Sequence, residues 1–165
     1  MPGEWKFVWD TAYVDNYEQC VTGATSTTCT DFVGFNIGDG AIPAFKSQFD
    51  IDWTYGDWEV TWRMRFVGAQ SENCTTSGVP LTVYGPPCSN VISSSSATNH
   101  LGATTYHNVQ VAYTLSEWDT RLTFGIQNIG DKQPPFSATA FANSFDPTVY
   151  EVPGRFPYLR ISKTF

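Results

Sequence analysis

The strongest constraint on the fold of this chain is a regular alternation of apolar and polar residues that returns in six separate segments. In the clearest segment, Trp58, Val60, Trp62, Met64 and Phe66 alternate with charged and hydroxyl side chains. Successive side chains of a β-strand point to opposite faces, so each segment predicts a strand with one apolar and one polar face. The six segments are residues 5–17, 45–55, 57–68, 105–115, 120–128 and 154–165. Each is long enough to cross a bilayer as a tilted strand, which takes roughly 9–11 residues.

The connections between these segments are short at one end and long at the other. Gly56 and Asp57 form a two-residue loop with Gly first, which is typical of a type II′ hairpin. Residues 116–119 form a second short connection. The long connections are residues 18–44, 70–103 and 131–153. Long structureless loops argue against a compact soluble domain, whereas this asymmetry of loop length is typical of outer-membrane β-barrels.

Aromatic residues gather on the apolar positions beside the short connections. Trp53, Tyr55 and Trp58 flank the first connection, and Tyr113 and Trp118 flank the second. The arrangement is similar to the aromatic girdle at a membrane interface. A β-sandwich with an aromatic core also has alternating strands, so periodicity alone leaves that fold open. The asymmetry of loop length favours the barrel.

The two-residue hairpin also predicts which residues face each other. If Tyr55 lies opposite Trp58, then Asp50 lies opposite Arg63 on the polar face. Opposite charges facing each other across a strand pair stabilise it by about 0.2–1 kcal/mol. A charged residue at mid-depth on a lipid-facing surface costs about 2–4 kcal/mol. We therefore predict an Asp50–Arg63 ion pair on a face that lines a lumen.

Composition narrows the class of protein further. The chain has 165 residues, of which 16% are aromatic and only 15% are charged, and its net charge is −7. An acidic chain lacks the basic footprint that nucleic acids require, so we expect no nucleic-acid partner. No run approaches the roughly 20 apolar residues of a membrane helix. No signal-peptide pattern is visible, which fits either a cytosolic protein or a chain that lacks its natural N-terminus.

The four cysteines lack the spacing of a zinc site. No two of them are spaced as a C-x₂-C pair, and all four lie in polar loop sequence. An even number of loop cysteines favours local disulfides, although four cysteines allow three connectivities and free thiols stay possible. The pairing that we expect is Cys20–Cys29 and Cys74–Cys88.

Two motifs near the C-terminus resemble those of one known family. The sequence "NIGDKQPP" follows the fifth alternating segment, and "YEVPGRFPYLRISKTF" ends the chain. Together they resemble the C-terminal end of TonB-dependent outer-membrane receptors. The resemblance rests on Asn128, Ile129, Asp131, Pro134, Pro135, Tyr150, Glu151, Gly154, Arg155 and Phe165. Pro157 and Lys163 depart from the family pattern: proline removes a ladder hydrogen bond, and lysine on the apolar parity must reach the interface.

The resemblance implies an all-β, antiparallel up-and-down meander of about six strands that forms part of a 22-stranded transmembrane barrel. It also implies that residues 1–165 form the C-terminal part of the barrel, without the plug domain and the earlier strands. Implied partners are outer-membrane lipid, the rest of the receptor with its plug, TonB through that plug, and the barrel-assembly machinery through the strand ending at Phe165. The implied role is uptake of a siderophore, cobalamin or oligosaccharide across a bacterial outer membrane.

Residue types with chemical potential do not form a recognisable catalytic or metal pattern. The acidic and basic residues of segments 45–55 and 57–68 are better explained as a lumenal lattice of ion pairs than as an acid–base pair. His100 and His107 lack a third ligand at a suitable spacing. We therefore expect no enzyme activity, no cofactor and no metal.

Ligand recognition is expected in the long loops, where aromatic and small polar residues mix. Aromatic rings there can stack on sugars or siderophore rings, although they can equally pack the loops against each other. The candidates are Tyr84, Phe136, Phe141, Phe145 and Tyr150. Two alternatives to a receptor remain at this point: a secreted, disulfide-linked β-sandwich that binds carbohydrate, and a non-functional receptor fragment.

Overall fold

The chain is an all-β protein. The computed structural model describes residues 2–37, 40–72, 88–89, 99–138, 140, 144–151 and 154–164. Within these ranges the chain forms twelve β-strands and one 3-10 turn, η1 (Ser116–Trp118), and contains no α-helix. The described residues include no helix of the length and apolar character needed to cross a membrane.

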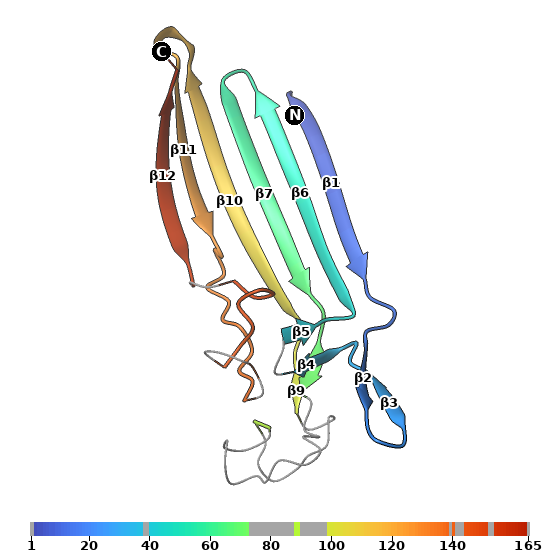
Figure 1. The fold of residues 1–165 in the computed structure, drawn as a ribbon. Helices are drawn as coiled ribbons and strands as arrows, with labels where there is room; N and C mark the ends of the chain where they lie inside the picture. The colour runs from blue at the N-terminus through green and yellow to red at the C-terminus, as the bar shows by residue number, and fades with distance from the viewer. Residues whose placement is uncertain are drawn as a thin grey trace.

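Six long strands form one antiparallel sheet in which each strand pairs with its neighbours in chain order (Figure 1). All six alternating segments of the sequence are therefore confirmed as strands, and their order is that of an up-and-down meander. The strands are β1 (Glu4–Tyr13), β6 (Phe45–Tyr55), β7 (Trp58–Val67), β10 (Thr104–Leu115), β11 (Thr120–Gln127) and β12 (Phe156–Lys163). Within the described residues, β12 does not pair with β1, so the sheet is open.

The predicted hairpin register is confirmed. Tyr55 pairs with Trp58 and Asp50 pairs with Arg63 across β6 and β7. Gly56 has a φ of 55°, the positive value that the first position of a type II′ turn requires. Because the register fixes parity across all six strands, the sheet has one apolar face and one polar face. The apolar face carries Trp5, Phe7, Trp9, Ile51, Trp53, Trp62, Val111, Phe124, Leu159 and Ile161, and the polar face carries Lys6, Asp10, Lys46, Gln48, Asp50, Glu59, Arg63, Arg65, Gln110, Arg121 and Arg160.

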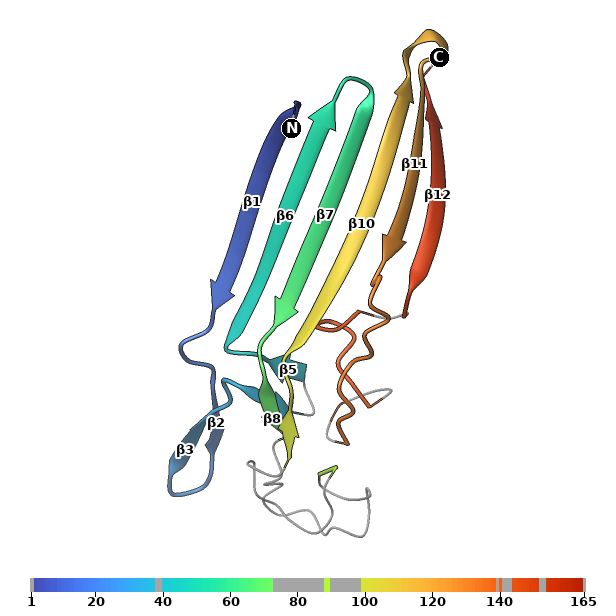
Figure 2. The ribbon, with the colours of Figure 1, turned by 180° about the vertical axis from the view of Figure 1, so that it is seen from behind.

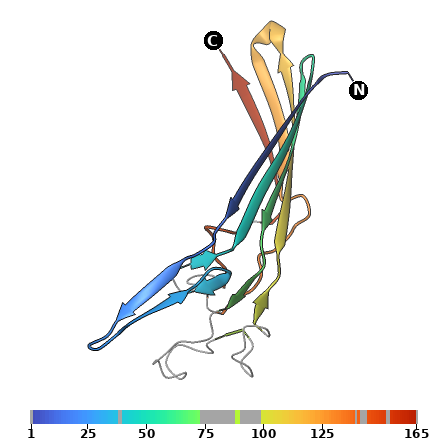
Figure 3. The same cartoon turned by 90° about the vertical axis from the view of Figure 1, so that its right-hand side faces the viewer.

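Among the described residues, no second layer covers the apolar face of the long sheet, and segment 144–151 covers the polar face only at one end. Viewed from the side in Figure 3, the six strands form a single thin layer. The apolar face is consequently open: Phe7 is 61% exposed, Trp9 is 71% exposed and Leu159 is 69% exposed. This is the reverse of a soluble β-sandwich, in which the apolar face packs against another sheet.

The sequence predicted long connections without structure, and this prediction is wrong for the described part of them. They contain short strands that form two small sheets beyond the end of the long sheet (Figure 2). These strands are β2 (Glu18–Thr22), β3 (Thr27–Asp31), β4 (Phe35–Ile37), β5 (Gly40–Ile42), β8 (Gln70–Glu72) and β9 (His100–Leu101). The β2–β3 hairpin projects to one side, and β4 pairs with β8 in parallel. We call this end of the molecule the loop end.

The buried core lies at the loop end. Val67 and Tyr106 from the long strands pack against Val149 and Tyr150 from the last long connection, and Phe145 packs at the edge of this group. Tyr150 is only 2% exposed, and burial raises the pKa of its hydroxyl to about 12. The last connection therefore folds back onto the polar face of the sheet.

The opposite end carries the short connections, and we call it the turn end. Both chain termini lie there (Figure 1). The turns are bonded to neighbouring strands: Thr114 donates its N–H to Asp57 O at 2.9 Å, and Thr164 donates to Asp119 O at 3.0 Å. Asp119 has a φ of 47° and ends η1 in the left-handed conformation. These bonds hold the turn end in one arrangement without a packed core.

Candidate functional site

Ion pairs cross the polar face of the long sheet between neighbouring or next-neighbouring strands. Arg63 binds Asp50 with two nitrogens, Nε at 2.9 Å and Nη2 at 2.8 Å. The carboxyl side chain is 12% exposed, whereas the arginine side chain is 47% exposed. Arg121 on β11 reaches Glu59 on β7 at 2.8 Å. The predicted Asp50–Arg63 pair is confirmed, and the polar face is a charge-paired surface.

The first family-like motif forms a compact junction where β11 ends. Asn128 has a φ of 47° and makes a pair of hydrogen bonds with Lys132. Its Nδ2 donates to Lys132 O at 2.9 Å, and its Oδ1 accepts from Lys132 N at 2.8 Å. Its own N–H donates to Asn108 Oδ1 at 2.7 Å. The side chain thus imitates a strand backbone, and it turns the chain sharply away from the sheet.

The second motif binds the first. Arg155 donates its backbone N–H to Asp131 Oδ1 at 2.8 Å and its Nε–H to Ile129 O at 3.0 Å. A Cβ at Gly154 would collide with the same Asp131 oxygen, so a side chain here would displace the carboxylate that Arg155 binds. The motifs therefore close the base of the last long connection. Pro134 and Pro135 are half-buried beside the junction, and Phe165 lies outside the described residues.

A buried glutamate joins two of the long connections, and the sequence analysis did not identify it. Glu72 is 1% exposed. Its Oε1 accepts from Ser89 Oγ, Ser137 Oγ and Ala138 N, each at 2.7 Å, and its Oε2 accepts from Ser89 N at 2.7 Å. Burial opposes ionisation of Glu72, but these hydrogen bonds outweigh it, and the pKa lies below the ordinary value. A signal was present, since Glu72 is the only charged residue between 66 and 116.

The segment 144–151 of the last connection is anchored at several points. Asp146 accepts from Ala41 N at 2.6 Å and from Thr148 N and Oγ1 at 2.8 and 2.7 Å. Burial opposes its ionisation, yet these bonds keep its pKa below the ordinary value. Gln70 donates to the Tyr150 hydroxyl at 2.8 Å. Segment 144–151 is therefore bonded to Ala41 on β5 and to Gln70 on β8.

Arg65 is the anchor that comes from the long sheet. Its Nη1 lies 3.3 Å from Glu151 Oε1, and its Nη2 donates to Val149 O. Its guanidinium carbon lies 5.6 Å from the centre of the Tyr106 ring, a cation–π distance. Arg65 thus links segment 144–151 to the polar face by charge, hydrogen bonding and ring contact.

A cavity of about 380 Å³ lies between the polar face and segment 144–151. Asp10, Lys46, Gln48 and Arg65 line it from the strands, and Thr148 lines it from the connection. The lining brings both signs of charge together with amide and hydroxyl groups. Its size falls within the range of small-molecule sites, so it is a candidate place for a ligand.

The aromatic loop candidates separate into three groups. Tyr84 and Phe141 lie outside the described residues. Tyr150 is buried and Phe145 packs beside it, as the loop-packing alternative expects. Phe136 is 64% exposed and is the one described candidate whose ring is free to stack on a ligand.

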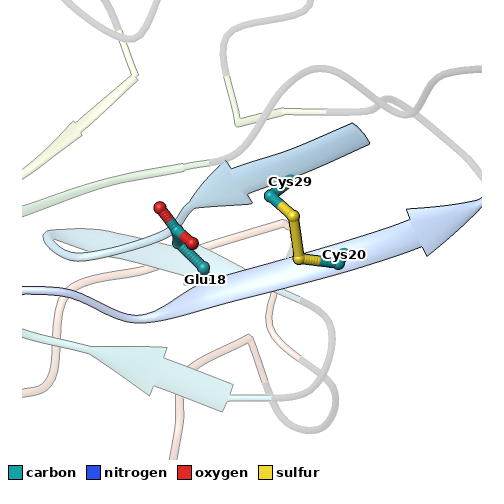
Figure 4. Close-up of side chains that lie close together, drawn as sticks. All are labelled: Glu18, Cys20 and Cys29. Atoms are coloured by element: carbon teal, nitrogen blue, oxygen red, sulfur yellow. A yellow bond between two sulfur atoms is a disulfide. The ribbon is translucent and has the colours of Figure 1, made fainter. Parts of the chain in front are cut away.

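The predicted Cys20–Cys29 disulfide is confirmed, and it joins directly paired residues of β2 and β3. Figure 4 shows Glu18 beside this bond. The three side chains approach closely enough to suggest a metal site, but both sulfurs are used in the S–S bond and offer no thiolate. Cys88 is also disulfide-bonded, and its predicted partner Cys74 lies outside the described residues.

The two histidines lie on different strands. His100 belongs to β9 at the loop end. His107 lies on the apolar face of β10, where its ring stacks on Trp62 with centroids 5.5 Å apart. The structure does not bring the two together with a third ligand in the described ranges.

Comparisons with known proteins found no matching family model, no matching curated protein and no matching solved structure.

Proposed function

We propose that this chain forms part of the wall and outer loops of an outer-membrane β-barrel receptor of the TonB-dependent kind, which imports a nutrient such as a siderophore, cobalamin or an oligosaccharide. The observation that carries the proposal is the open apolar face of the long sheet. Within the part of the chain that the structure describes, no second protein layer covers the large aromatic side chains of this face. In water such a patch drives aggregation, whereas lipid is a suitable solvent for it.

The tryptophans support this placement. Five of the six lie on the apolar parity of β1, β6 and β7, and the sixth lies in the turn η1. At the turn end, Trp58 and Tyr113 have ring centroids 4.7 Å apart, and Trp53 stacks on Tyr55 at 6.1 Å. Aromatic rings with a polar atom favour the boundary between lipid and water. The turn end would therefore lie at the periplasmic interface.

The polar face and the loop end support the other half of the proposal. The polar face would line the lumen, where its ion pairs are accessible to water. The loop end, with its disulfide hairpin and its cavity, would face the cell exterior, where oxidising conditions preserve disulfides. The junction of Asn128, Asp131, Gly154 and Arg155 gives a physical role to the same residues that resemble the receptor family.

The open edges of β1 and β12 complete the proposal. A strand edge in lipid leaves backbone N–H and C=O groups without partners, which costs several kcal/mol for each group. We propose that both edges pair with further strands of the same receptor, so that residues 1–165 form the C-terminal part of a barrel of the 22-stranded type. The plug, and through it TonB, belongs to the rest of that receptor.

A secreted β-sandwich that binds carbohydrate is less well supported. That fold needs a second sheet against the apolar face, and the two small sheets extend beyond the end of the long sheet instead. The disulfide hairpin is compatible with both functions and does not distinguish them.

Epitope insertion in the native receptor gene tests the proposal. One tag is placed between Gly23 and Ser26 at the tip of the β2–β3 hairpin, and a matched control tag is placed at Glu117 in the short turn. We expect antibodies to label the hairpin tag on intact cells and the turn tag only after the outer membrane is permeabilised. Recovery of the untagged product as a soluble monomer without detergent would reject the proposal, as would equal labelling of the two tags.

A further inference from the structure

The cavity beside segment 144–151 contains two cations and one anion. Lys46 and Arg65 extend from neighbouring strands β6 and β7, and Asp10 extends from β1. Lys46 forms no hydrogen bond or ion pair within the described ranges, although its charge lowers the pKa of Asp146. Arg65 is already paired with Glu151, so Lys46 is the cation of the wall that is available to a ligand.

Arg65 has capacity for another acceptor. Its two terminal nitrogens bind Glu151 and Val149, but its Nε–H has no partner among the described residues. A guanidinium presents its donors as a fork that matches a carboxylate. Glu151, at 3.3 Å, shows that a carboxylate already occupies part of this fork. A carboxylate in the cavity would therefore compete with Glu151 for the same guanidinium.

The remaining lining includes apolar residues such as Ala12 and Val67, and a few of its polar groups can bond hydroxyls. Gln48 and Thr148 offer amide and hydroxyl partners, and the Asp10 carboxylate accepts hydrogen bonds but repels a second negative charge. These features disfavour a polyanion and favour a singly charged molecule with several hydroxyls.

We propose that this cavity binds a hydroxylated carboxylate of monosaccharide size, such as a sugar acid, through Lys46 and Arg65, and that binding displaces Glu151 and loosens segment 144–151. This inference rests on the proposed import function, since it names the class of nutrient and couples its capture to movement of an outer connection. When the ligand carboxylate replaces Glu151 at Arg65, Val149 and Tyr150 would lose their packing against Val67.

Calorimetric titration of the whole receptor that contains this chain, in detergent micelles, tests the ligand class. The probe is galacturonate, and the matched control is galactose, which has the same ring without the carboxylate. We expect galacturonate to bind at least tenfold more tightly than galactose. Lys46→Gln and Arg65→Gln should each weaken galacturonate binding by tenfold or more. Arg121→Gln removes an arginine of the same face that does not line the cavity, and it should leave binding unchanged.

Glu151→Gln tests the competition. If Glu151 is an internal competitor, this variant binds galacturonate several-fold more tightly, whereas a purely structural role predicts weaker binding, as for Arg65→Gln. Galacturonate should also raise the hydrogen-exchange rates of the backbone amides in 146–151 in the unmodified protein. Equal binding of the two sugars, or weaker binding by Glu151→Gln, overturns the inference. A tagged receptor that inserts correctly but shows either result retains the proposed function and loses only this site.

Discussion

The two members of the Asp50–Arg63 pair differ in their access to water, and this difference predicts unequal effects of mutation. Arg63→Gln leaves a carboxyl side chain that is 12% exposed without its bidentate partner. We expect a loss of about 1–3 kcal/mol in the free energy of unfolding. Asp50→Asn leaves a guanidinium that is 47% exposed and able to turn to water, so about 1 kcal/mol or less is expected.

Urea unfolding in micelles measures both variants. Arg121→Gln is the control, because its pair with Glu59 is about one-third exposed on both sides and such pairs contribute little. Equal losses for Arg63→Gln and Asp50→Asn would contradict the assigned difference in exposure.

Gly125 is a position where the addition of a single Cβ atom is expected to lower stability. It pairs with Tyr158 across β11 and β12, and a Cβ at Gly125 would overlap the tyrosine ring. The same ring carries a hydroxyl that donates to Gln110 on β10 at 2.8 Å. Tyr158 thus crosses β11 over a glycine and joins three strands. Gly125→Ala should displace the ring and break this hydrogen bond.

We expect Gly125→Ala to cost about 1–3 kcal/mol, the usual range for overpacking. Gly102→Ala is the matched control, since a Cβ there meets no atom within 4 Å. Thermal unfolding in micelles should show a lower midpoint for the first variant alone. A similar midpoint for both variants would show that the Tyr158 ring moves aside without a loss of stability.

At the scale of elements, Glu72 makes the two long connections that it joins sensitive to acid. A carboxyl group with a lowered pKa contributes stability above its unfolded pKa of roughly 4.3, and the contribution is lost as the pH falls through the folded value. We expect the protection factor of the Ala138 amide, which donates to Glu72, to be constant near pH 7 and to fall in acid, as the pH passes through the lowered pKa of Glu72.

Glu72→Gln separates this effect from general acid unfolding. The amide side chain cannot accept all four hydrogen bonds, so we expect protection of Ala138 to be at least tenfold lower at neutral pH and insensitive to acid. Glu117→Gln, in the exposed turn η1, is the control and should resemble the unmodified chain. Acid sensitivity that persists in Glu72→Gln would assign the effect to another group.

The elements also show where the sequence was informative and where it was not. The long strands follow from period-two alternation, and the single two-residue turn at Gly56 determines the pairing of Asp50 with Arg63. By contrast, β2 and β3 have polar residues at both parities, so only the cysteine spacing indicated their contact. The parallel pairing of β4 with β8 depends on residues distant in the chain, which local pattern cannot predict. Glu72 was recognisable only as an isolated charge, with no indication of its partners.

At the scale of the whole molecule, the distribution of tryptophans predicts how the protein meets lipid. We expect brominated acyl chains to quench most of the tryptophan fluorescence of the reconstituted protein, because the rings lie on the apolar face. Bromines near the headgroups should act on Trp118 at the turn end, and deeper bromines should act on Trp62 in the middle of β7. Trp118→Phe and Trp62→Phe should each remove the corresponding component. Efficient quenching of all six by aqueous acrylamide would contradict this orientation.

The apolar face of the long sheet has no second layer in the described ranges, and this has a consequence for the environment in which the protein is stable. A ten-residue strand such as β1 is roughly 33 Å long, and at a tilt of about 45° it covers roughly 23 Å, close to the apolar band of known barrels. Under the proposed function, lipid takes the part that a packed core takes elsewhere, and bilayer thickness becomes a determinant of folding. Bilayers that match this span should stabilise the sheet most, and thicker ones should expose its ends to hydrocarbon and favour the unfolded chain.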